Sequence, residues 1–167
     1  MSGSGAGYLI RPAGEEDLDA IAAFEVEIAV VSFGTEAITD AAFHRRRVAG
    51  SLGKAGEIAL VAVTETGPAE PLGWAWMSAR TNSLTGARYG NFRSLAVADV
   101  ADRGPIGELL MEAVLAAADS AGFTHLAGKV NAGNLRMRSL YRAFGFTATH
   151  ITMERHFSVS TPPGELP

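Results

Sequence analysis

The stretch from residue 92 to residue 115 reads FRSLAVADVADRGPIGELLMEAVL, and the expected fold follows from it. An apolar strand runs into a short turn that contains Gly104 and Gly107, and the turn opens an amphipathic helix. The first backbone N–H groups of such a helix have no partner inside it, and the helix dipole makes that end positive. The stretch therefore predicts an anion site, with a phosphate or pyrophosphate group as the natural ligand.

The composition limits the classes of protein to consider. The chain has 167 residues, 47% of them hydrophobic and 19% charged, which fits one domain with a sizeable core. Its net charge of −4 argues against a nucleic-acid binder. Because the chain has no cysteine, disulfides, zinc–thiolate sites and a cysteine nucleophile are excluded. Without an apolar run of about 20 residues or a signal peptide, we expect a cytoplasmic protein that binds no membrane.

Residue patterns predict one domain over 8–157, preceded by a flexible lead-in over 1–7 and followed by a proline-rich tail over 158–167. In the lead-in and in the tail, small residues or prolines replace the apolar periodicity. The predicted strands are 8–11, 58–64, 72–79, 88–97, 124–130 and a last strand or hairpin over 146–157. The predicted helices are 18–28, 40–48 with Thr39 as N-cap, a helix from 106 that Gly122 closes, and 131–144.

This order of elements predicts an α+β fold around a mixed sheet. The first strands follow one another as antiparallel neighbours, with Trp74 and Trp76 on one face of their strand. The strand 88–97, the helix from 106 and the strand near 124–130 form a β-α-β unit. We therefore expect these two strands to be parallel, with a right-handed crossover.

Several kinds of site are disfavoured. The turn lacks the Gly-x-Gly-x-x-Gly pattern and the later acid of dinucleotide-binding proteins, and Gly107 is not followed by the Lys-Ser/Thr of a P-loop. The four histidines show no ligand spacing, so we predict no metal. A Gly-x-Ser-x-Gly nucleophile elbow is also absent.

The chain resembles the GNAT superfamily of acyl-CoA-dependent N-acyltransferases. Two motifs carry the resemblance: Leu95-Ala96-Val97 followed by Ile106-Gly107-x-Leu109-Leu110, and Asn134-x-x-Met137-x-x-Leu140-Tyr141-x-x-x-Gly145-Phe146. The opening Ile10-Arg11-Pro12-Ala13 is also typical of such proteins. The family's turn usually reads Arg/Gln-x-x-Gly-x-Gly/Ala, whereas an ungapped match places Asp102 and Pro105 at its Arg/Gln and first Gly positions. A shifted register would bring Arg103 and Gly104 into the motif instead.

The resemblance implies acetyl-CoA as cofactor and a set of residues that contact it. These are Leu95, Ala96, Val97, Asp102, Arg103, Gly104, Pro105, Ile106, Gly107, Glu108, Asn134, Arg138 and Tyr141. Asn134 has a second interpretation as a helix N-cap, and Tyr141 has one as an amphipathic packing residue.

The resemblance further implies direct transfer of the acetyl group to a primary amine of a small molecule or peptide in a ternary complex. The catalytic candidates are the backbone N–H of Leu95 as oxyanion donor, Tyr141 as acid toward the leaving thiolate, and Glu27 as base. Polyamines, aminoglycosides and lysine side chains are all compatible acceptors for this acidic protein. The candidate acceptor residues are Glu25, Glu27, Phe33, Trp76, Asn91 and Arg93.

Each acceptor candidate has a plainer interpretation as a solvated or packing residue. The alternative function is an acyl-CoA-binding regulatory module without catalysis on the same fold. A homodimer is a further expectation, because dimers are common in this superfamily.

Overall fold

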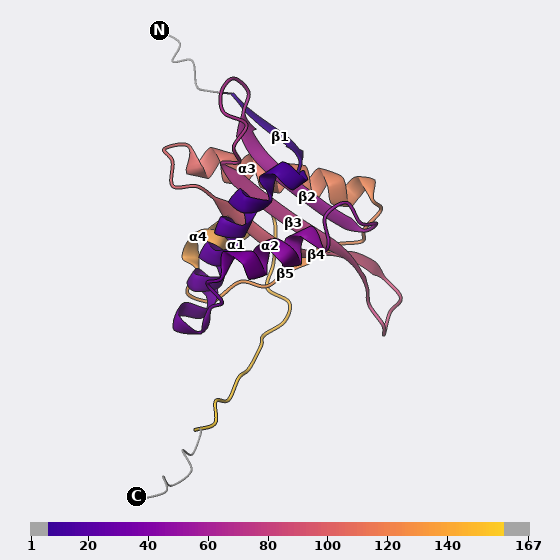
Figure 1. The fold of residues 1–167 in the computed structure, drawn as a ribbon. Helices are drawn as coiled ribbons and strands as arrows, with labels where there is room; N and C mark the ends of the chain where they lie inside the picture. The colour runs from indigo at the N-terminus through magenta and orange to yellow at the C-terminus, as the bar shows by residue number, and fades with distance from the viewer. Residues whose placement is uncertain (1–6, 159–167) are drawn as a thin grey trace, which may run out of the picture.

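The computed structural model describes residues 7–158 as a five-stranded sheet flanked by four α-helices (Figure 1). The strands follow the order β1-β2-β3-β4-β5, antiparallel from β1 to β4 and parallel between β4 and β5. The predicted α+β class and the parallel β-α-β pair are thus confirmed. The elements are β1 (Tyr8–Pro12), α1 (Leu18–Phe33), α2 (Ala41–Ala49), β2 (Glu57–Thr64), β3 (Gly73–Thr81), β4 (Arg88–Val97), α3 (Arg103–Ser120), β5 (Leu126–Gly128) and α4 (Leu135–Ala143).

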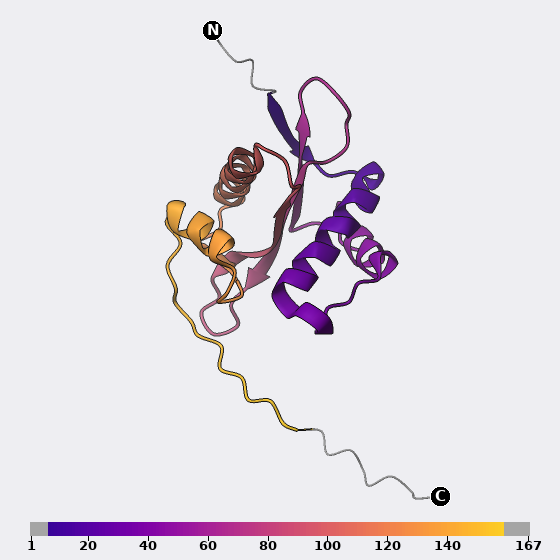
Figure 2. The same ribbon diagram turned by 90° about the vertical axis from the view of Figure 1, so that its left-hand side faces the viewer.

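The helices form two layers, with α1 and α2 on one face of the sheet and α3 and α4 on the other (Figure 2). Strand β3 serves both layers because its side chains alternate. Trp74 and Trp76 lie on one face, as predicted, and that face packs against α1, whereas Ala75 and Met77 belong to the cluster that α3 covers. The buried stripe of α3 supplies that second cluster with Ile106, Leu110, Met111, Val114 and Ala118.

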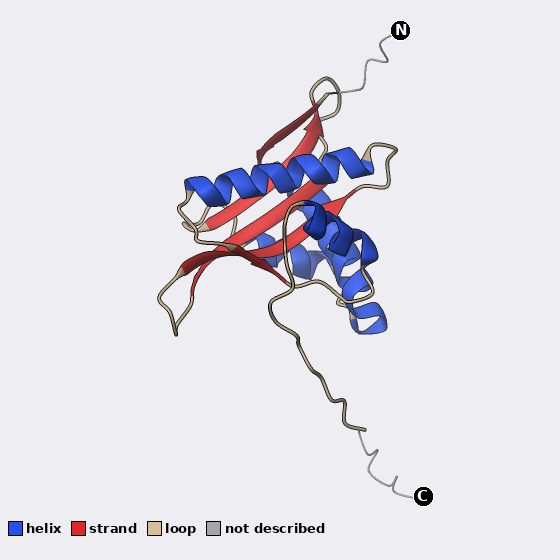
Figure 3. Cartoon of the chain, turned by 180° about the vertical axis from the view of Figure 1, so that it is seen from behind, coloured by secondary structure: helices blue, strands red, loops and turns tan. Residues whose placement is uncertain are grey.

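Strand β4 is paired unequally on its two sides. It pairs with β3 along its whole length, but with β5 only from Gly90 to Phe92. Figure 3 shows the short β5 and the helix α4 that follows it on the face that carries α3. Beyond Phe92 the outer edge of β4 has no neighbouring strand within the described residues.

The register shows which groups this free edge presents. The N–H of Ala98 donates to the carbonyl of Leu72 at 2.8 Å, on the β3 side. Because N–H directions alternate along an antiparallel strand, Leu95 and Val97 turn their N–H and C=O groups away from β3. Two backbone donors on β4 are therefore available to a ligand.

A β-bulge interrupts the same strand. Trp76 lies opposite Ser94 whereas Met77 lies opposite Phe92, so β4 has one extra residue, Arg93, at this point. The bulge changes which side chains of β4 face each layer. Phe92 packs in the α3 layer, while Ala96 packs in the α1 layer.

Several local predictions differ from the structure, and one is the start of α3, which lies at Arg103 rather than at residue 106. Helix α1 continues through Val30 to Phe33, and α2 is capped by Asp40, whose carboxylate accepts from the Ala42 N–H, rather than by Thr39. The strand predicted over 124–130 is shortened to three residues, and the helix predicted over 131–144 begins at Leu135.

The last of the predicted strands is absent. Residues 147–158 form no strand and are exposed, and Figure 1 shows this segment running away from the sheet. The other residues of the predicted lead-in and tail, 1–6 and 159–167, lie outside the part that the structure describes. Among the helices of residues 7–158, none is long and apolar enough to cross a membrane.

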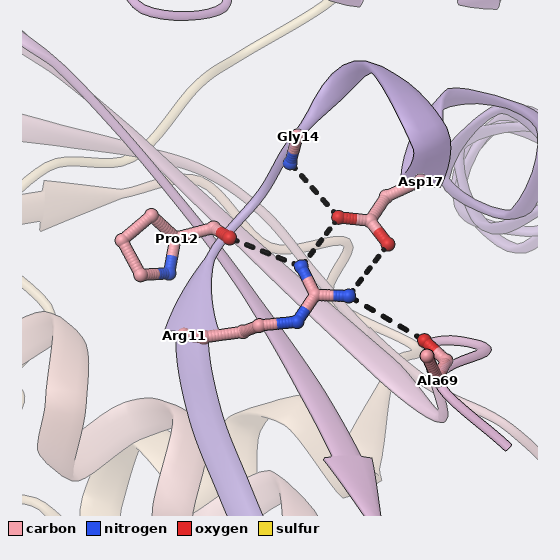
Figure 4. Close-up of polar contacts among 5 residues, drawn as sticks. All are labelled: Arg11, Pro12, Gly14, Asp17 and Ala69. Carbon is pink, nitrogen blue, oxygen red and sulfur yellow. Dashed lines mark hydrogen bonds and ion pairs between the residues drawn. The ribbon is translucent and has the colours of Figure 1, made fainter.

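A buried ion pair joins the first strand to the first helix (Figure 4). Asp17, whose side chain is 2% exposed, accepts hydrogen bonds from Arg11 at 2.7 and 2.9 Å and from the Gly14 N–H at 2.8 Å. Burial raises the pKa of Asp17, but the Arg11 hydrogen bonds, the Gly14 N–H and the Arg11 charge together bring it below its ordinary value. The carboxylate thus stays ionised and closes the turn between β1 and α1.

We expect Asp17→Asn to lower the free energy of unfolding at pH 7 by roughly 3 kcal/mol, because it leaves Arg11 without its anion. Since the folded pKa is depressed, the wild-type advantage is present above about pH 4 and disappears as the pH falls through the folded value. Urea unfolding at several pH values measures this. Asp19→Asn is the matched control, because the Asp19 side chain is 88% exposed and its bond to Arg45 should contribute little. Equal losses for the two variants would contradict the assignment.

Candidate functional site

A cavity of about 480 Å³ lies along the free edge of β4. It extends from the bulge at Arg93 to the start of α3, and α1 and α4 provide its walls. The lining residues are Glu27, Ile28, Val31 and Ser32 of α1, Arg93 to Val97 of β4, Arg103, Gly104, Gly107 and Glu108 of α3, Lys129, Val130 and Asn131 after β5, and Asn134, Arg136, Met137, Ser139, Leu140, Tyr141 and Ala143 of α4 and its N-cap.

The first turn of α3 offers one backbone donor to this cavity. The Arg103 N–H already donates to Val100, and Pro105 has no N–H. The Gly104 N–H has no acceptor within residues 7–158. A Cβ built on Gly104 would meet no atom within 4 Å, so the missing side chain leaves open space beside the positive end of the helix. These features fit a phosphate group at Gly104.

The two residues that depart from the usual turn do not line the cavity. Asp102 accepts a hydrogen bond of 2.6 Å from the hydroxyl of Tyr8 on β1. Pro105 is exposed at the third position of α3, and Ile106 is buried in the core below. Of the turn residues predicted to contact a cofactor, the structure places Arg103, Gly104, Gly107 and Glu108 in the cavity, and Asp102, Pro105 and Ile106 outside it.

The cavity is more cationic than the protein as a whole. Four of its lining residues carry positive charge (Arg93, Arg103, Lys129 and Arg136) against two acids, Glu27 and Glu108. The whole chain instead has 14 basic and 18 acidic residues. Local positive excess in an acidic protein fits an anionic ligand that bears several phosphates. Glu27 is an ion-pair partner of Arg103, at 3.4 Å.

Tyr141 reaches the cavity from the last turns of α4. Its ring is 9% exposed and packs on Phe92 and Phe146, with centroid distances of 6.0 and 4.7 Å. Burial raises the pKa of Tyr141 to about 12. Because this pKa is far above neutral, the hydroxyl is protonated at pH 7. It has no hydrogen-bond acceptor within residues 7–158 and can therefore donate to a ligand.

Gly128 makes the position of this hydroxyl feasible. A Cβ on Gly128 would come within 2.4 Å of the Tyr141 oxygen, a distance that real side chains do not show. The Tyr141 ring lies against the last residue of β5, and only a glycine at that position leaves room for its hydroxyl.

Asn134 combines its two predicted interpretations. Its side-chain oxygen caps α4 by accepting from the Met137 N–H at 3.1 Å, and the residue also lines the cavity. Arg138 lies outside the cavity and donates to the carbonyl of Ala132. The basic lining residues Arg136 and Lys129 were not predicted. A helical plot of α4 could have suggested Arg136, but no motif marks Lys129.

Of the lining residues of α1, Glu27 was predicted, whereas Ile28, Val31 and Ser32 were not. Val31 and Ser32 lie beyond the point where the sequence pattern ends, and the carbonyl of Ser32 accepts from the Asn131 side chain at 3.1 Å. This contact ties the end of α1 to the segment after β5. Val31 and Ser32 could have been predicted only by extending the helix to Phe33, where α1 ends.

The predicted acceptor residues divide into two groups. Glu27 and Arg93 line the cavity, whereas Glu25, Phe33, Trp76 and Asn91 do not. Glu25 is 2% exposed and is held by the Trp74 indole N–H at 2.8 Å and by Arg47. Phe33 is 67% exposed at the end of α1.

Comparisons with known proteins agree with this architecture. The family described as Acetyltransferase (GNAT) matches residues 23–146. No curated protein sequence matches the chain. Because the family match spans most of its residues, the chain belongs to the GNAT family of acetyltransferases, as its motifs predicted.

Solved structures show the same fold at low sequence identity. A variant of the BH1408 protein from Bacillus halodurans superposes with a TM-score of 0.79 at 18% identity, covering 89% of this chain and 99% of that one. A probable acetyltransferase has a TM-score of 0.72 at 17% identity, covering 92% and 99%. An aminoglycoside antibiotic 6'-N-acetyltransferase from Acinetobacter baumannii has a TM-score of 0.67 at 18% identity, covering 92% and 100%.

We expect Gly128→Ala to displace the Tyr141 ring and expose its hydroxyl, lowering the Tyr141 pKa from about 12 toward the ordinary value of about 10. Ultraviolet titration of the tyrosinate, with Tyr141→Phe subtracted to identify the signal, measures this. Gly104→Ala is the control, because its new Cβ has open space. A titration curve of Gly128→Ala that overlays the wild type would show that Gly128 does not position the ring.

Proposed function

We propose that this protein is an N-acetyltransferase that transfers the acetyl group of acetyl-CoA to a primary amine in a ternary complex. The observation that carries the proposal is the free edge of β4 beside Tyr141. There, the N–H groups of Leu95 and Val97 and a protonated hydroxyl serve one cavity.

The cavity residues fit the parts of coenzyme A. The edge of β4 from Leu95 to Val97 is suited to pair with the amides of an extended cofactor arm, as a neighbouring strand would. Gly104 and the start of α3 fit its pyrophosphate, and Arg103, Arg136 and Lys129 supply positive charge for its phosphates. Acetyl-CoA contributes an activated thioester, whose C–S bond is exchanged for an amide C–N bond while one ammonium proton ends on sulfur.

Leu95 is placed to stabilise the transition state. A backbone N–H that points from β4 into the cavity can donate to the carbonyl oxygen of the thioester as negative charge develops there. This donor is fixed by the β3–β4 ladder, so it requires no reorganisation during the reaction.

Tyr141 acts on the sulfur as a hydrogen-bond donor. A thiol has an ordinary pKa of about 8.5, some 3.5 units below that of Tyr141, so full proton transfer from the tyrosine would cost roughly 5 kcal/mol. Donation of a hydrogen bond to the developing thiolate is favourable without that cost. The proton that ends on sulfur then comes from the ammonium group of the acceptor.

Glu27 is the proposed first acceptor of the amine proton, directly or through water. A lysine-like amine has a pKa near 10.4 and must lose a proton before it attacks. Glu27 is one of the two lining carboxylates. Arg103 contacts its Oε1 at 3.4 Å, and its Oε2 is available to take a proton.

Acetyl-CoA binding tests the cofactor site. Saturating acetyl-CoA, at about 100 times its dissociation constant, should stabilise the wild type by roughly 2.7 kcal/mol in a thermal shift measurement. Gly104→Glu should abolish most of this shift, because it fills the open space and adds negative charge at the phosphate position. Ala116→Glu on the exposed side of α3 is the control with the same change in charge. Equal shifts in the two variants would move the cofactor elsewhere.

Release of free thiol over a panel of amines tests catalysis. We expect Tyr141→Phe to lower kcat about 10- to 100-fold, the effect of losing one hydrogen bond to a charged group, with little change in acetyl-CoA affinity. Tyr89→Phe is the control, since Tyr89 stacks on His125 and does not line the cavity. If acetyl-CoA binds but no amine yields thiol, the protein is instead the non-catalytic acyl-CoA-binding module.

A further inference from the structure

Arg93 is the bulge residue of β4, and its side chain stacks on an aromatic ring. The bulge that makes it the extra residue of β4 also turns its side chain onto the face of Trp76, where its guanidinium carbon lies 3.6 Å from the ring centroid. One of its nitrogens makes a long contact of 3.4 Å with the Ser78 hydroxyl. Arg93 also lines the cavity, so its cation is fixed against the ring and accessible to a ligand.

The acids near Arg93 are already engaged. Glu57 accepts from the Trp76 indole at 2.7 Å and from the Ser78 hydroxyl at 2.5 Å. Glu25 accepts from Trp74 and from Arg47. Within residues 7–158, no carboxylate lies within ion-pair distance of Arg93.

The local field adds to this imbalance. Burial and the charge of Arg47 lower the pKa of Arg93, as does the charge of Arg80, against the opposing effect of Glu57 and Glu25. The guanidinium nevertheless stays charged at neutral pH, since its ordinary pKa is above 12. A half-buried cation without an anion is costly, and a ligand carboxylate would remove that cost.

The position of Arg93 separates it from the phosphate site. Val97, where the chain turns toward α3, lies four residues along β4 from Arg93, a distance of roughly 13 Å. Leu95, the proposed oxyanion donor, lies between the two ends. Arg93 and the proposed phosphate site at Gly104 therefore lie on opposite sides of Leu95. If the cofactor fills the Gly104 side, the acceptor enters on the Arg93 side.

We propose that Arg93 binds a carboxylate of the acceptor, so that the substrate is a small amine of the amino-acid type rather than a polycationic amine. This inference rests on the proposed function, in which acetyl-CoA is the second ligand of the cavity. Arg93 lies two residues, roughly 7 Å, from Leu95 along β4, which matches an acceptor whose carboxylate is a few bonds from its nitrogen. A second positive charge on the acceptor would be repelled by Arg93.

Matched acceptors test the proposal. Each amino acid is compared with its carboxamide and with the amine that lacks the carboxylate, and kcat/KM is measured by thiol release. We expect the wild type to favour the carboxylates about 10- to 100-fold, as for one charge-assisted hydrogen-bonded pair. Arg93→Met keeps an apolar side chain on Trp76 and should remove this preference, by lowering kcat/KM for the carboxylates about 10- to 100-fold toward the values of their carboxamides.

Two further variants control for structure and charge. Arg93→Lys should retain part of the preference, and its melting temperature shows whether loss of the planar stack alone disturbs the fold. Arg80→Met removes an exposed cation outside the cavity and should leave the preference intact. A wild type that favours polyamines, or an Arg93→Met variant with an unchanged preference, would overturn the proposal while leaving acetyl transfer in place.

Calorimetric binding of the same acceptors to the CoA-saturated protein separates this inference from the proposed catalysis. If carboxylates bind to the wild type and not to Arg93→Met, the carboxylate site stands even when no amine yields thiol. If no carboxylate binds or reacts while other amines do, the carboxylate site is refuted and the transferase remains. Failure of every acceptor to bind or react refutes the carboxylate site as well.

Discussion

The structure depends on one constraint, the unequal pairing of β4. A central strand normally has its backbone donors and acceptors satisfied on both sides, and exposed edges invite uncontrolled pairing. Here β5 ends after three residues, because the chain leaves the sheet at Gly128 and returns as α4. The result is a row of oriented peptide groups on β4 that a flexible, amide-bearing ligand can pair with. The end of α1 and the side chains of α4 make this edge into a cavity rather than a flat surface.

The parts of the fold that depend on strong local periodicity could be predicted from the sequence. The bounds of β4 and the parallel β4–β5 pair followed from an apolar run, a turn and a striped helix. Helix α1 was predicted too short because its last turn, from Val30 to Phe33, has no buried face and so shows no helical stripe. The opposite error arose at residues 147–158, where Ile151 and Met153 alternate with threonine as in a strand. Such propensity expresses itself only against a partner, and the described chain supplies none.

The site was predictable where it depends on the order of elements and not where it depends on contacts between distant residues. The turn motif located Arg103, Gly104 and Gly107 in the cavity, but gave no indication that Asp102 would bond to Tyr8, 94 residues earlier in the chain. The Asp102 carboxylate is bonded to β1 and does not line the cavity, so its negative charge lies outside the site proposed for the phosphates. A bulge is equally invisible in one sequence, because it is a property of the register between two strands.

The layer between the sheet and α1 shows why the bulge matters chemically. Burying Glu25 and partly burying Glu57 is costly, and the two indole N–H groups, the Ser78 hydroxyl and Arg47 offset that cost with hydrogen bonds and charge. In return these acids hold Trp74 and Trp76 in fixed orientations. A guanidinium stacked on an indole that cannot turn loses little conformational freedom when it binds an anion. Glu25 and Glu57 therefore form no ion pair with Arg93. They fix the aromatic surface on which it rests, and its charge remains for the ligand.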